Sequence, residues 1–174
     1  MRQCVAVLDY GYPWDGLIAR WKFGGEAGWS GPWAELMLRH PSVLPALQGN
    51  DLLVPVPIGS ARLAERGFNQ AWGLTRALLQ RIPQPRPKAL ADALVRVRDT
   101  PDQHSLPRAQ RLLNLRGAFA AHPRHLPTLT GARVLLVDDV STTGATLESA
   151  AQALLDAGAA RIHALVLART PADG

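Results

Sequence analysis

The feature that most constrains the fold is a strand, helix and strand pattern within residues 133–168. Arg133 to Val137 is an apolar run, and Ile162 to Ala168 is a second one. Between them, Thr143 to Ala157 carries apolar residues at helical spacing and is followed by Gly158, a residue typical of helix C-termini. Because parallel strands need a crossover connection, this unit predicts an α/β fold with a central, mainly parallel sheet flanked by helices.

The rest of the chain supplies further periodic segments of the same one-domain unit, residues 1–174. Residues 1–50 are expected to form a helical N-terminal part, whose tryptophans favour an aromatic layer over the core rather than a base-stacking platform. The predicted helices are Trp14 to Phe23, Trp29 to Leu38 and Phe68 to Leu79, and the predicted strands are Asp51 to Pro57 and Leu94 to Arg98.

The net charge of +5 is unevenly distributed along the chain. Ser60 to Arg116 contains ten Arg and one Lys against four acids, so this segment carries +7 and the remainder −2. A cationic block of this kind attracts polyanions, whether pyrophosphate, a nucleotide or a nucleic-acid backbone.

No apolar run approaches the length needed to cross a bilayer, and the start lacks a basic segment followed by an apolar one. We therefore expect a cytoplasmic protein with no membrane insertion. The single cysteine, Cys4, excludes an internal disulfide and supplies too few thiolates for a structural zinc site.

The segment Val134 to Thr146 carries the strongest chemical signal. A buried strand leads into two adjacent carboxylates, Asp138 and Asp139, which can accept hydrogen bonds from vicinal ribose hydroxyls or hold Mg²⁺ directly or through water. The small residues that follow can point amides and hydroxyls at a phosphate near a helix N-terminus. The candidate phosphoribosyl-binding residues are Asp138, Asp139, Ser141, Thr142, Thr143, Gly144, Ala145 and Thr146, with the two acids as catalytic and metal-holding candidates.

A purely structural interpretation is also open. Asp139 or Ser141 could cap the following helix while Asp138 ends a strand in solvent. Two acids followed by Thr-Thr-Gly-Ala-Thr are a rarer combination than one helix cap, which favours the functional interpretation. The segment is not a Walker A loop, because no Gly-Lys-Ser/Thr follows the strand.

These residues resemble the signature of type I phosphoribosyltransferases, and further motifs resemble the ComF family of competence-related phosphoribosyltransferase-like proteins. The motifs are Lys22-Phe23-Gly24-Gly25, Val54-Pro55-Val56-Pro57, Arg62, Arg66-Gly67-Phe68-Asn69-Gln70 and the dispersed set Arg98, Thr100, Gln103, Leu106, Arg108, Arg111, Asn114 and Phe119.

The resemblance implies a type I phosphoribosyltransferase fold with a small hood and a flexible loop. It places pyrophosphate at Ile58, Gly59 and Ser60, with Arg62 and Arg66 just beyond. It also implies a lid at Thr100 to Asn114, with Arg108 and Arg111 as its cationic contacts, and Mg²⁺ as cofactor. Many ComF proteins begin with a four-cysteine zinc module, whereas here Cys4 is the only cysteine before Tyr10 and Tyr12. Either this member lacks the module or the chain begins late.

Two functions follow from the resemblance. The first is binding of 5-phosphoribosyl-1-pyrophosphate or a ribose 5-phosphate ligand, with transfer of the phosphoribosyl group to an unidentified acceptor. The alternative is a non-catalytic protein of natural transformation that binds nucleotides or single-stranded DNA, together with other competence proteins. A fold with a silent site is disfavoured by the intact acids and turn.

Overall fold

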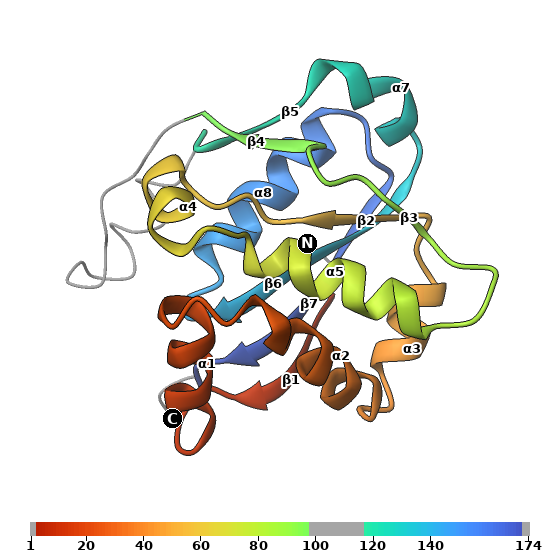
Figure 1. The fold of residues 1–174 in the computed structure, drawn as a ribbon. Coiled ribbons are helices and arrows are strands. Elements are labelled where there is room, and N and C mark those ends of the chain that lie inside the picture. Colours follow the sequence, from red (N-terminus) through yellow and green to blue (C-terminus); the bar gives the residue numbers. More distant parts are fainter. Residues whose placement is uncertain (1–2, 98–116, 172–174) are drawn as a thin grey trace.

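The computed structural model describes residues 3–97 and 117–171, which are built around a five-stranded parallel sheet (Figure 1). The strand order is β1-β7-β6-β2-β3. Every pairing within this sheet is parallel. The strands are β1 (Gln3–Asp9), β2 (Leu52–Pro55), β3 (Lys88–Ala89), β6 (Arg133–Ser141) and β7 (Arg161–Arg169).

The sheet has a step at the carboxyl end of its central strand. β2 pairs with β6 only from Leu52, opposite Val134, to Pro55, opposite Val137. On its other side β6 stays paired with β7 as far as Ser141, opposite Arg169. β6 therefore continues past the end of its neighbour β2, and the ends of all five strands open toward the same edge, where α/β sheets bind ligands.

Helices cover both faces of the sheet. One face carries α1 (Trp14–Phe23), α2 (Ser30–Leu38), α3 (Val43–Gln48) and α5 (Gln70–Arg81), with a 3₁₀ turn at Ala27–Trp29 before α2. The other face carries α8 (Ala145–Asp156) and an antiparallel ribbon of β4 (Leu94–Arg96) and β5 (Phe119–Ala121). The remaining elements are α4 (Ser60–Arg66), a 3₁₀ turn at Pro123–His125 and α7 (Leu126–Leu129).

Alternation along the strands builds a separate core on each face. Leu135 and Val137 of β6 pack with α1, α2, α3 and α5. Val134 and Leu136 pack with α8 and the β4–β5 ribbon. This doubly covered arrangement explains why β6 is apolar at consecutive positions from Val134 to Val137 rather than alternating with polar residues.

Several predicted elements are confirmed, and others differ at their ends. Helix α1 has the predicted bounds, while α5 and α8 each lie within two residues of those expected. The expectation that residues 1–50 are helical is corrected, because Gln3–Asp9 forms β1. Most side chains of this edge strand are only partly buried and Val5 alone is buried, so its sequence lacks the continuous apolar pattern of β6. The predicted lid at Thr100 to Asn114 lies outside the described residues.

Within residues 3–97 and 117–171, no helix has both the length and the apolar character that a bilayer span requires.

Candidate functional site

The two acids lie in the part of β6 that extends beyond β2. The backbone N–H of Asp139 donates to Asp138 Oδ1 at 2.9 Å, and the N–H of Val140 donates to Asp139 Oδ1 at 2.6 Å. Burial, together with the neighbouring charge of Asp139, raises the pKa of Asp138 well above its usual value. A carboxyl group held in this way favours a ligand that supplies hydroxyl donors, since such donors stabilise the charged form.

Lys22 pairs with the second acid from the C-terminal end of α1. Its Nζ lies 3.2 Å from Asp139 Oδ2, and the two side chains are only 16% and 12% exposed. The sequence singled out Lys22-Phe23-Gly24-Gly25 as a motif but gave it no role. The structure brings it to the acid pair, and the resemblance motif was the only available signal, because no local pattern relates residue 22 to residue 139.

Arg66 reaches the same place from α4. Its guanidinium carbon lies 4.8 Å from the centroid of the Phe23 ring, a cation–π distance. Its Nη1 donates to Gln70 Oε1 at 3.3 Å. Burial lowers the pKa of Arg66, while the charge of Asp139 acts in the opposite direction. The Lys22 and Arg66 motifs therefore meet at the acid pair.

The turn between β6 and α8 is formed by Thr142 to Gly144. Gly144 has φ 79° and ψ −7°, a left-handed conformation that glycine adopts freely. The Ala145 N–H has a long contact of 3.4 Å to Thr143 Oγ1, and the first amides of a helix have no partner within the helix. Thr142 is exposed, Thr143 and Thr146 are half-buried, and Ser141 is the buried last residue of β6. Thr142, Thr143 and Thr146 are thus at least partly accessible around the start of α8, where a phosphate is expected.

The loop after β2 lies beside the acid-bearing strand. The Val56 N–H donates to the Val137 carbonyl at 2.9 Å, so the chain is still held against β6 just before Ile58 and Gly59. Helix α4 then begins at Ser60 and contains Arg62 and Arg66. Of these predicted pyrophosphate residues, Arg66 shows an electrostatic interaction with Asp139. Arg108 and Arg111 lie outside the described residues.

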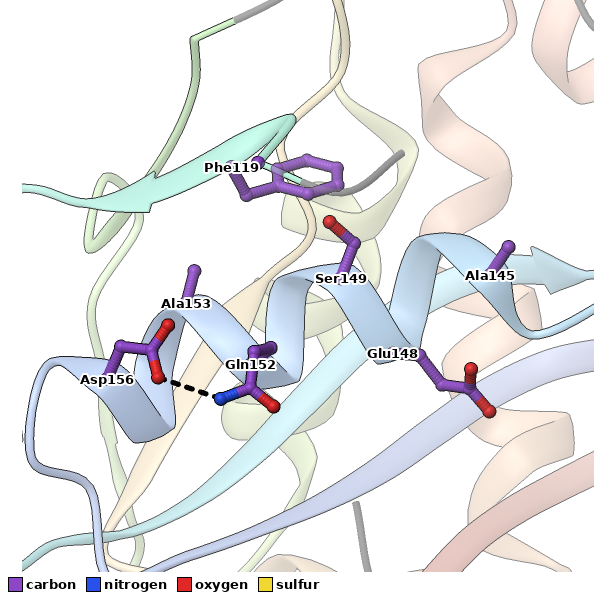
Figure 2. A pocket seen from close by; sticks show the side chains of 8 residues that line it. Phe119, Ala145, Glu148, Ser149, Gln152, Ala153 and Asp156 are labelled. Carbon is purple, nitrogen blue, oxygen red and sulfur yellow. Dashed lines mark hydrogen bonds between the residues drawn. The ribbon is translucent and has the colours of Figure 1, made fainter. Parts of the chain in front are cut away.

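A pocket of about 530 Å³ lies on the outer side of α8, beneath β5 (Figure 2). It is lined by Phe119 of β5 and by α8 side chains that include Glu148 and Asp156, and Gln152 Nε2 donates to Asp156 Oδ1 at 2.7 Å. Two carboxylates make it unsuited to a phosphate. It shares only Ala145 with the predicted phosphoribosyl residues and does not include the acid pair.

The side chains of the site could bind Mg²⁺ only if a bound substrate or water supplied the remaining oxygen ligands. Among residues 3–97 and 117–171, no group of three or more His, Cys, Asp or Glu side chains is placed to hold a metal ion. Mg²⁺ is commonly bound by one or two carboxylates together with waters and substrate phosphates, and Asp138 and Asp139 meet that requirement.

A parallel sheet with adjacent acids at its carboxyl edge and a glycine turn leading into a helix is the arrangement expected of a type I phosphoribosyltransferase-like α/β protein. A model of the phosphoribosyl transferase domain matches residues 46–174. The chain belongs to this family and, within it, to the ComF group of phosphoribosyltransferase-like proteins.

Three relatives support that assignment along most of the chain. DNA utilization protein YhgH of Escherichia coli (strain K12) is 34% identical, over 97% of this chain and 73% of its own length. Competence protein F of Haemophilus influenzae is 32% identical, with 95% and 72% covered. Competence protein ComFC of Bacillus subtilis (strain 168) is 30% identical, with 98% and 65% covered.

A purine phosphoribosyltransferase from Pyrococcus horikoshii Ot3 aligns with 96% of this chain and 88% of its own, at 18% identity and a TM-score of 0.38.

Proposed function

We propose that the protein binds 5-phosphoribosyl-1-pyrophosphate, or a ligand with the same ribose 5-phosphate group, at the carboxyl end of β6. The observation that supports this most directly is the succession of two carboxylates and a left-handed glycine turn along one stretch of backbone. Carboxylates suit the ribose hydroxyls, and the amides at the start of α8 suit the 5-phosphate.

The reaction that fits such a ligand is transfer of the phosphoribosyl group to a nitrogen nucleophile. The bond between C1 and the pyrophosphate oxygen breaks, pyrophosphate departs with the bonding electrons, and C1 bonds to the nitrogen, which then loses a proton. Positive charge develops on the ribose as pyrophosphate leaves, and the negative charge of Asp138 and Asp139 would stabilise it. Arg62 and Arg66 would attract the departing pyrophosphate.

Mg²⁺, when bound with the ligand, would offset the charge of the pyrophosphate oxygens. Asp138 and Asp139 are the residues that would hold it, directly or through water. Asp139 already accepts from Val140 and pairs with Lys22, so Asp138 has the greater capacity for a further contact.

Calorimetric titration of the wild-type protein with 5-phosphoribosyl-1-pyrophosphate, with and without Mg²⁺, tests the proposal. Asp138→Asn should abolish measurable binding and leave the melting temperature unchanged or higher, because the substitution removes a charge that burial disfavours. Asp156→Asn makes the same chemical change at the far end of α8 and should bind like wild type. Wild-type binding retained in Asp138→Asn would contradict the assignment, and pyrophosphate release with an amine or base would establish catalysis.

A second candidate function is binding of nucleotides or single-stranded DNA in natural transformation, inside the cell. The names of the relatives, which refer to DNA utilization and competence, favour it, as does the +7 charge of Ser60 to Arg116. Binding of the phosphoribosyl ligand without pyrophosphate release would favour this alternative over catalysis.

A further inference from the structure

The contacts of Lys22 are those of a side chain that fixes another residue. Its ammonium pairs with Asp139 Oδ2, while Asp139 Oδ1 accepts from the backbone of Val140. Both carboxylate oxygens of Asp139 are therefore held by the protein, and the plane of the carboxylate is set before any ligand arrives.

Lys22 itself is held by its position in α1. The preceding residue, Trp21, is fully buried in the core on that face of the sheet. The following residue, Phe23, lies against the guanidinium of Arg66 in α4. Trp21 anchors the C-terminal end of α1 to the core, and the backbone at Lys22 is thereby held where its side chain reaches Asp139.

The positive charge of Lys22 also reduces the repulsion between the Asp138 and Asp139 carboxylates. Adjacent carboxylates repel each other, and this repulsion opposes the ionisation of both. A nearly buried ammonium beside one acid offsets that repulsion more than an exposed cation does, because solvent screens it less.

We propose that Lys22 is a positioning residue of the phosphoribosyl site, which holds the Asp139 carboxylate so that the acid pair meets the ribose hydroxyls in one fixed geometry. This inference rests on the proposed phosphoribosyl binding. Lys22 acts through Asp139 and not by contacting the ligand.

Calorimetric titration with 5-phosphoribosyl-1-pyrophosphate and Mg²⁺ tests it in four single variants. Lys22→Met should weaken binding by about ten- to a hundredfold, the loss typical when a residue that orients a metal-ligating side chain is removed. Lys22→Arg should recover most of the affinity. Arg20→Met is the matched control, since it removes a cation from the same helix at an exposed pair with Glu26, and it should bind within about twofold of wild type. Asp139→Asn is the fourth variant, with which the double variant described next is compared.

The double variant Lys22→Met with Asp139→Asn separates positioning from direct contact. If Lys22 acts through Asp139, the double variant binds as Asp139→Asn alone does. A further loss in the double variant would show that Lys22 acts on the ligand independently and would overturn the proposal. Full affinity in Lys22→Met would overturn it too.

The remaining outcomes are also informative. The double variant also removes the Asp139 carboxylate, which Lys22→Met alone would leave without its nearly buried partner, so the double variant can be compared with Asp139→Asn even if Lys22→Met does not fold. Absence of binding by wild type would instead refute the proposed function, a result distinct from any difference among variants.

Discussion

At the residue scale, Gly144 has the most demanding backbone of the candidate site. Its φ of 79° lies in the left-handed region, yet a Cβ added there would meet no atom within 4 Å. Any cost of a side chain at this position therefore comes from backbone conformation and not from a clash.

Gly144→Ala should lower the free energy of unfolding by about 1–2 kcal/mol, the cost of placing a non-glycine residue in a left-handed conformation. Gly144→Asn should cost less, because asparagine tolerates that conformation better. Urea denaturation of the three proteins measures the difference. Equal stability of the Ala variant and wild type would show that the turn can relax to another conformation.

Individual site residues were predictable where their signal is local. Asp138, Asp139 and Gly144 stand within one short segment, so residue type and order sufficed to place them at the end of a strand and before a helix. The partnership of Lys22 with Asp139 was not predictable in this way, because it depends on how α1 packs against the sheet.

At the element scale, a pair of charged side chains joins β2 and β6 at the edge of the sheet opposite the acids. Asp51 accepts from Arg133 Nη2 at 2.6 Å and from Arg133 Nε at 3.1 Å, and the Arg133 backbone N–H donates to it at 2.8 Å. These hydrogen bonds from Arg133 lower the pKa of Asp51 from 3.8 to about 2. The contact joins the residues at the start of the two strands, whose register leaves β2 ending before the position of Asp138.

Asp51→Asn should therefore reduce stability in a pH-dependent way. A carboxyl whose pKa is lowered on folding contributes stability above its unfolded pKa of 3.8, and that contribution is lost as the pH falls through about 2. Both side chains are nearly half exposed, so we expect a loss of only about 0.5–1 kcal/mol at pH 6. Urea denaturation at pH 6 and pH 2 checks this.

The partner variant Arg133→Gln should show a similar or smaller loss at pH 6, because it removes the two side-chain donors to Asp51 and keeps the backbone N–H donor. A difference between Asp51→Asn and wild type that stays constant from pH 6 to pH 2 would rule out the ionised carboxylate as its source.

Elements with a continuous or strongly periodic apolar pattern were predictable, and short or edge elements were not. α1 and the core of β6 carry such patterns. β3 has only two residues, β5 has three, and α4 has no buried side chain, so none of them has enough apolar signal to be recognised alone. Packing against α8 and β2 defines the positions of β5 and β3.

At the scale of the whole molecule, the cationic charge is the property most relevant to a nucleic-acid partner. Arg62 and Arg66 belong to the Ser60 to Arg116 segment of charge +7. Both are in α4, and Arg66 interacts with Asp139 near the carboxyl end of β6. Phe23 is 62% exposed and Tyr12 is 95% exposed, so aromatic surface lies on the segment that leads into and forms α1. Cations and exposed aromatic rings together are the usual means of binding single strands.

If the protein binds single-stranded DNA, replacing Arg62, Arg66, Arg108 and Arg111 together by Gln should weaken binding at every sequence and reduce the salt dependence. Each lost phosphate contact lowers the slope of log K against log[salt] by about 0.7 for single strands. Fluorescence anisotropy of a labelled oligonucleotide over a range of salt concentrations measures the slope. Replacing Arg124, which pairs with Asp92 in the 3₁₀ turn before α7, is the control. An unchanged slope in the fourfold variant would place DNA binding elsewhere on the protein.

The pairing of β1 with β7 has a consequence for how the molecule assembles. On the ribosome, Gln3–Asp9 emerges long before Arg161–Arg169, the strand with which it pairs in the described part of the sheet. β1 therefore stays unpaired until all of the intervening chain and β7 itself have been translated, and during that time its strand edge is exposed to any other extended peptide nearby.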